Sequence, residues 1–120
     1  MKLIASLIPL LFSWQAHSQL LAGTWSRFDE KGVLKEVMTL RKPNHFIATL
    51  FDRDRKVVAV ENGEYTIKGD SICFSFKQII SWKRKRWVNA DPKEMKPVTY
   101  RMEQIGHRLI INDNKYIEDL

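Results

Sequence analysis

The stretch from residue 65 to residue 76, Tyr-Thr-Ile-Lys-Gly-Asp-Ser-Ile-Cys-Phe-Ser-Phe, decides the fold class. Gly69-Asp70 separates two runs in which apolar and polar residues alternate, and this pattern is typical of a hairpin with a tight turn. After the turn, Ile72, Phe74 and Phe76 fall on the same face of the strand. Period-two alternation of this kind predicts a strand with one buried face.

The same alternation extends through most of the chain after residue 20, where no apolar residues recur at helical spacing over three turns. The pair Asn62-Gly63 fits either a tight turn or a bend within one longer strand. With the bend, eight strands are expected, over residues 24–28, 34–40, 45–52, 57–68, 72–77, 98–105, 108–111 and 116–117.

Eight short strands joined by short turns predict an all-β fold, an up-and-down antiparallel β-barrel. Closure of the sheet removes the unpaired edges that invite aggregation. A β-sandwich is the rival architecture, but sandwiches need long crossing connections. Only the segment from residue 82 to residue 97 is long enough to provide one.

Residues 1–18 have the composition of a secretory signal peptide. Lys2 supplies a basic start, residues 3–14 are mostly apolar, and Ala16-His17-Ser18 offers small residues where a signal peptidase cleaves. The apolar run is shorter than the roughly 20 residues of a membrane-spanning helix. We therefore expect cleavage, with residues 19–120 forming a periplasmic or secreted domain. An uncleaved N-terminal anchor is the alternative.

The segment Leu21-Ala22-Gly23-Thr24-Trp25 follows directly and opens the first expected strand. It resembles the Gly-x-Trp signature of lipocalin-like (calycin-type) β-barrels, and residues 63–72 resemble a hairpin of the small bacterial members. The resemblance implies that Gly23 lets the chain turn into the barrel and that Trp25 closes one end. It also implies that an arginine packs across the Trp25 ring, with Arg101 and Arg108 as the two candidates.

The function expected on this basis is the binding of a small apolar or amphipathic ligand inside the barrel or at its mouth. Eight-stranded barrels either fill with side chains or enclose one small ligand. The candidate ligand-binding residues are Met38, Leu40, Phe74, Phe76, Gln78, Tyr100 and Met102, with Gln104 as a second inward polar candidate and Trp82 or Trp87 near the entrance.

Residues suited to catalysis or metal binding form no recognisable motif in the sequence. His45 and His107 stand beside turn residues and are expected to be exposed. The sequence contains no His-Glu-x-x-His motif, no paired cysteines and no nucleophile elbow. We therefore expect no enzymatic activity, no metal and no cofactor.

The segment Trp82-Lys83-Arg84-Lys85-Arg86-Trp87 places four consecutive cations between two tryptophans. In one continuous strand the two rings would face opposite sides, so we expect this segment to leave the fifth strand and enter a loop. Such a basic loop supports a second hypothesis, an envelope interaction protein that binds anionic lipid or polysaccharide. The alternative is a solvated hairpin extension whose charges favour solubility.

Nucleic acid is not an expected partner of this chain. The formal net charge is +6, but acidic residues are interspersed among the basic ones and no nucleic-acid-binding module is recognisable. The oligomeric state is left open by the sequence.

Overall fold

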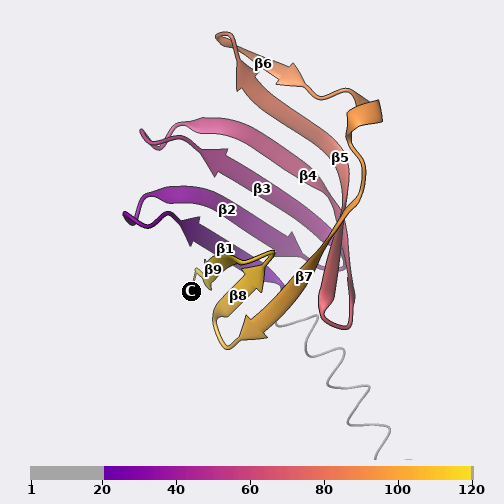
Figure 1. The fold of residues 1–120 in the computed structure, drawn as a ribbon. Helices are drawn as coiled ribbons and strands as arrows, with labels where there is room; N and C mark the ends of the chain where they lie inside the picture. Colours follow the sequence, from indigo (N-terminus) through magenta and orange to yellow (C-terminus); the bar gives the residue numbers. More distant parts are fainter. Residues whose placement is uncertain (1–20, 120) are drawn as a thin grey trace, which may run out of the picture.

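Alternating apolar and polar side chains produce nine strands within residues 21–119, the part of the chain that the computed structural model describes (Figure 1). The expected signal peptide lies outside the described residues. The elements are β1 (Gly23–Phe28), β2 (Leu34–Arg41), β3 (His45–Phe51), β4 (Val57–Lys68), β5 (Ser71–Lys83), β6 (Arg86–Asn89), the 3-10 helix η1 (Pro92–Glu94), β7 (Val98–Ile105), β8 (Arg108–Ile111) and β9 (Asn114–Glu118).

The strands form one antiparallel sheet in the order β4-β3-β2-β1-β9-β8-β7-β5-β6, with an additional pairing of β4 and β5. Because β5 pairs with both β4 and β7, eight of the described strands close into a barrel, and the predicted architecture is confirmed. Strand β6 is additional to this ring and pairs with the last residues of β5 (Figure 1). Among residues 21–119, no helix is long and apolar enough to cross a membrane.

Strand β4 runs through Asn62 and Gly63 with a bend, so this pair is not a turn. The register with β5 shifts here, because Asn62 pairs with Gln78 whereas Gly63 pairs with Phe76. Residue Lys77 is therefore an extra residue in β5, which is the arrangement of a β-bulge. Strands β4 and β5 approach so closely at the bulge that a Cβ atom on Gly63 would lie 2.0 Å from the backbone oxygen of Ser75.

The hydrophobic core occupies the end of the barrel at which β1 begins. Trp25 is completely buried, as the resemblance implies, and its indole Nε1 donates a hydrogen bond of 2.9 Å to the carbonyl oxygen of Leu21. The buried core residues are Leu21, Trp25, Met38, Leu40, Phe46, Ala48, Tyr65, Ile72, Phe74, Met102, Leu109, Ile111 and Tyr116.

The expectation that an arginine packs across Trp25 is wrong. Arg101 and Arg108 each precede a buried residue of their strand, so alternation directs both arginine side chains to the outside. The Arg101 side chain is 89% exposed and its Nε lies 3.9 Å from a carboxylate oxygen of Asp70. Arg108 is exposed as well.

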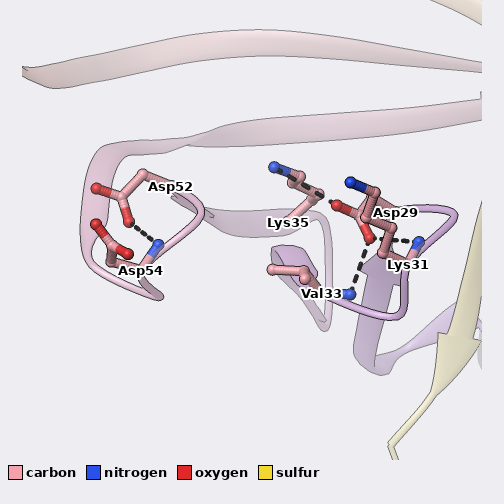
Figure 2. A network of polar contacts seen from close by, with 6 residues as sticks. All are labelled: Asp29, Lys31, Val33, Lys35, Asp52 and Asp54. Carbon is pink, nitrogen blue, oxygen red and sulfur yellow. Dashed lines mark hydrogen bonds and ion pairs between the residues drawn. The ribbon is translucent and has the colours of Figure 1, made fainter.

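The β1–β2 turn is held by the carboxylate of Asp29 (Figure 2). Its Oδ1 accepts hydrogen bonds from the backbone N–H groups of Lys31 and Val33, each 2.9 Å long. The bond from Val33 is the main reason that the pKa of Asp29 lies below its ordinary value. Gly32 occupies the left-handed position of this turn, with φ of +79°.

The β3–β4 turn repeats the arrangement with one difference in residue type. Asp52 Oδ1 accepts hydrogen bonds from the N–H groups of Asp54 at 2.8 Å (Figure 2) and of Lys56 at 3.0 Å. The left-handed position is occupied here by Arg55, with φ of 62°. A residue with a Cβ atom in this conformation is strained by about 1 kcal/mol.

Exchange of the residue types at these two equivalent positions is expected to move stability in opposite directions. Arg55→Gly should stabilise the protein by about 0.5 kcal/mol, because relief of the strain exceeds the extra chain entropy of glycine. Gly32→Ala should destabilise it by about 1 kcal/mol through strain alone, since a Cβ atom there meets no atom within 4 Å. Urea unfolding of both variants measures the changes in the free energy of unfolding. Changes of the same sign would contradict the left-handed backbone conformation at the two positions.

Candidate functional site

A cavity of about 180 Å³ lies inside the barrel, next to the core. Its apolar wall consists of Met38, Phe46, Ala48, Phe74, Phe76, Tyr100 and Ile111, and its polar wall consists of Glu36, Glu61, Asn112, Asn114 and Tyr116. Asn112 and Asn114 are exposed residues around the β8–β9 turn, so the cavity reaches the surface there.

Aromatic rings from three strands form the apolar wall. The ring centroid of Phe46 lies 4.9 Å from that of Phe74 and 5.6 Å from that of Phe76, with both pairs edge to face. Phe74 also lies 6.4 Å from Tyr100. Edge-to-face packing is favourable and orients each ring, so this wall is preorganised for an apolar group.

Glu36 is the first of two carboxylates on the cavity wall, and its partners are protein side chains. It accepts a hydrogen bond of 2.9 Å from the Tyr116 hydroxyl and forms an ion pair of 3.2 Å with Arg27. Burial, and then the negative charge of Glu36, raise the pKa of Tyr116 far above its ordinary value. The phenol therefore keeps its proton and remains a hydrogen-bond donor to Glu36.

Glu61 is the second carboxylate, and its situation differs. It lies in β4 between Ala48 of β3 and Ile79 of β5 and is half-buried. Among residues 21–119, no side chain forms a hydrogen bond or ion pair with it. Burial raises the pKa of Glu61, and the charge of Glu36 raises it further. The cavity thus presents one acidic group that forms no ion pair with a cation among residues 21–119.

The structure brings four of the predicted ligand-binding residues to the cavity, namely Met38, Phe74, Phe76 and Tyr100. Leu40 and Met102 are buried in the core but do not line the cavity. Gln104 does not line it either, and its amide donates a hydrogen bond to the carbonyl oxygen of Gly106 in the β7–β8 turn.

The placement of Gln78 at the cavity is wrong. Its side chain is exposed and hydrogen-bonded to those of Asn62 and Asn89. Strict alternation from Phe76 would turn Gln78 inward, but the extra residue Lys77 reverses the alternation. Glu61 therefore has Ile79 as its partner in β5, and Gln78 faces outward with Asn62.

Sequence reasoning missed the polar groups that do line the cavity. Glu36 shares a strand face with Met38 and Leu40, and this alternation was a usable signal for an inward carboxylate. Glu61 and Tyr116 carried no equally direct signal, because the bend at Gly63 and the short strand β9 obscure which of their faces is inside.

The first eight residues of the connection from residue 82 to residue 97 form a β-hairpin, as in the alternative of a hairpin extension, so the expected loop is wrong for them. Strand β5 extends to Lys83, and Trp82 pairs with Trp87 while Lys83 pairs with Arg86. The two-residue turn returns the chain, which places both indoles on one face of the hairpin. The remaining connection to β7, residues 90–97, contains the 3-10 helix η1.

The two histidines lie in different places at the surface. His45 is exposed at the start of β3, and His107 lies in the β7–β8 turn with its Nδ1 2.8 Å from Glu118 Oε2. Within residues 21–119, no group of three or more His, Cys, Asp or Glu side chains is arranged to hold a metal ion.

Comparison of the chain with family models, curated proteins and solved structures finds no match. The closed antiparallel barrel is compatible with a lipocalin-like fold. A function for this chain is therefore argued from the residues that line the cavity and from the charges around it.

Glu61→Gln is expected to make stability less dependent on pH. The folded protein holds the Glu61 proton more tightly than the unfolded chain does, because the folded pKa is raised above the ordinary 4.5. That contribution is fully present below pH 4.5 and is lost as pH rises through the folded pKa. The variant lacks this loss, so its stability relative to the wild type should increase as the pH rises above 4.5.

Thermal or urea unfolding across this pH range measures the difference between Glu61→Gln and the wild type. Glu64→Gln is the matched control, because Glu64 lies in the same strand but has a side chain that is 43% exposed and paired with Lys77 at 3.1 Å. A stability difference for Glu61→Gln that does not change with pH would contradict the raised pKa.

Proposed function

We propose that this chain is a lipocalin-like binding protein whose barrel holds one small molecule with an apolar body and a positively charged head. The observation that carries the proposal is the half-buried carboxylate of Glu61, which lies on the cavity wall and has no hydrogen-bond or ion-pair partner among residues 21–119. Ligand sites combine apolar walls with a few oriented polar groups in this way. The proposed role is binding rather than catalysis.

The size of the cavity limits the ligand to about one ring or a short chain. An apolar protein cavity of about 150 Å³ accepts benzene, and this cavity measures about 180 Å³. Drug-sized ligands occupy pockets of roughly 300 Å³ or more. A long fatty acid therefore could enter with only part of its chain.

The charge of the cavity favours a cationic head group. Glu36 is already neutralised by Arg27, so a ligand ammonium group would pair with Glu61. Such a pair would lower the pKa of Glu61 and release a proton when the ligand binds. An anionic head group would add a further negative charge beside two carboxylates, which is unfavourable.

Export and membership of the lipocalin-like family are part of the same proposal. Export is supported by the composition of residues 1–18, and the family by the Gly23-Thr24-Trp25 segment together with the barrel. Recovery of the expressed chain from the periplasm, with its N-terminus near Gln19, tests export. Retention of residues 1–18 in the recovered protein would contradict cleavage.

Titration with three ligands of one shape and different charge tests the ligand class, with NMR chemical shifts of cavity residues as the readout. We expect benzylamine to bind with Kd between about 10 µM and 1 mM, within the efficiency limit of very small ligands. Benzyl alcohol should bind more weakly, and benzoate at least about tenfold more weakly than benzylamine. No shift change at cavity residues with any of the three would overturn the proposal.

Variants on the two faces of β4 show whether the selectivity arises in the cavity. Glu61→Gln should remove the preference for benzylamine over benzyl alcohol, whereas Glu64→Gln on the outside should preserve it. Ala48→Leu, at a buried position of the wall, should fill the cavity and abolish binding of all three ligands. Equal preference in wild type and Glu61→Gln would show that Glu61 does not contact the ligand.

A further inference from the structure

The end of the β5–β6 hairpin extends past the part of the sheet that supports it. Strand β4 pairs with β5 as far as Ser81, so residues 82–87 pair only with one another. Figure 1 shows the hairpin standing apart from the closed ring of strands. This position makes the hairpin end accessible to a large partner.

One face of the hairpin end carries an exposed aromatic pair. Trp82 is 46% exposed and Trp87 is 43% exposed, and their ring centroids lie 5.4 Å apart with an interplanar angle of 63°. The edge-to-face contact makes the two indoles a compact apolar wedge, whereas stacking on a base or sugar requires a free flat ring face. Indoles of this kind favour the interface between lipid and water.

The edge and the opposite face of the hairpin end are cationic. Lys83 and Arg86 pair across the strands opposite the indoles, and Arg84 and Lys85 form the turn. All four side chains are exposed, and no acidic side chain among residues 21–119 forms an ion pair with any of them. The positive charge is therefore directed outward without internal neutralisation.

The turn keeps its cations in an unfavourable backbone conformation. Arg84 and Lys85 have φ of 53° and 65°, a combination for which Asn-Gly is the preferred sequence. The β8–β9 turn shows the usual solution, with Asn112 and Asp113 at the positive φ angles. The hairpin turn therefore carries two cations at positions where Asn, Asp or Gly would be less strained.

We propose that the Trp82–Trp87 hairpin is a membrane-contact site that binds an anionic lipid surface. The four cations attract the lipid phosphate groups, and the two indoles enter the interface between headgroups and acyl chains. This site is separate from the cavity, since none of its residues lines it.

Flotation of the protein with lipid vesicles tests the proposal. We expect binding to phosphatidylcholine vesicles containing phosphatidylglycerol, little binding to phosphatidylcholine alone, and weakening between 0.05 and 0.5 M salt as the charges are screened. Absence of binding to the anionic vesicles at low salt would overturn the proposal. Equal binding to both kinds of vesicle would also overturn it.

Three double variants separate charge, aromatic insertion and folding. Arg84→Asn/Lys85→Gly removes two cations while giving the turn its preferred sequence, so it should weaken vesicle binding about 30-fold and leave folding intact or improved. Trp82→Ala/Trp87→Ala should also weaken binding, by about tenfold or more. Arg53→Gln/Lys56→Gln removes the same charge from the exposed β3–β4 turn and should weaken binding far less.

Equal losses in the hairpin and β3–β4 variants would show attraction to the overall charge and would overturn the assignment to this hairpin. A soluble anionic polysaccharide, heparin, provides the remaining comparison. Binding to heparin that requires both tryptophans, without binding to anionic vesicles, would assign the hairpin to a polysaccharide instead of a membrane.

Discussion

Trp25→Ala is expected to lower the free energy of unfolding by about 4 kcal/mol, within the range for large aromatic residues replaced by alanine in protein cores. The Trp25 side chain is completely buried, and its strand β1 lies between β2 and β9, where Trp25 is in register with Met38 and Glu118. Its loss removes a large apolar contact area and leaves a cavity at the closed end of the barrel. It also leaves the carbonyl oxygen of Leu21 without its indole donor.

Urea unfolding followed by circular dichroism measures this change. Trp25→Phe is the second variant, because it keeps an aromatic ring and should cost about half as much while leaving the barrel folded. Trp82→Ala is the matched control at an exposed position and should cost less than about 1 kcal/mol. A loss below about 1 kcal/mol for Trp25→Ala would show that this ring does not hold the barrel together.

Gly63→Ala is expected to destabilise the protein by about 3 kcal/mol, near the upper end for overpacking changes. The added Cβ atom would lie 2.0 Å from the backbone oxygen of Ser75 and 3.0 Å from the backbone N of Lys77. Both obstacles are backbone atoms of β5, so no side-chain rotation relieves the contact. The two strands must separate, which weakens their hydrogen bonds at the bulge.

Gly69→Ala is the control, because it makes the same chemical change without a steric obstacle. Gly69 has φ of +58° in the β4–β5 turn, and a Cβ atom there meets no atom within 4 Å. Only backbone strain of about 1 kcal/mol is expected from this variant. Equal losses in the two variants, measured by urea unfolding, would contradict the close approach at Gly63.

The alternation of apolar and polar residues along the chain determines where the strands lie and, for most of them, which side chains point into the barrel. Alternation predicted strands close to β1–β4 and β7–β9 and the first half of β5, because in a strand with one buried face apolar and polar residues alternate. The same rule placed Met38, Phe74, Phe76 and Tyr100 inside the barrel, where they line the cavity. The closed barrel followed from the number of strands and their short connections.

Pairing between distant strands determined the rest of the candidate site. The bulge at Lys77 reversed the alternation of β5 and moved Gln78 outside. The two-residue turn at Arg84-Lys85 placed both tryptophans of the hairpin on one face, where a continuous strand would have separated them. In both cases one residue more or less changes which side of the sheet a side chain occupies.

The sequence by itself determined the antiparallel barrel, since each strand's alternation is a local property, and the resemblance of Gly23-Thr24-Trp25 to the Gly-x-Trp signature implied the inward position of Trp25. Only the tertiary structure decided that Glu36 and Tyr116, 80 residues apart, share a hydrogen bond beside Glu61, which has no such partner among residues 21–119. The physical reason is register: partners across a closed sheet are set by bulges, turns and strand order, and these depend on contacts between segments far apart in the chain.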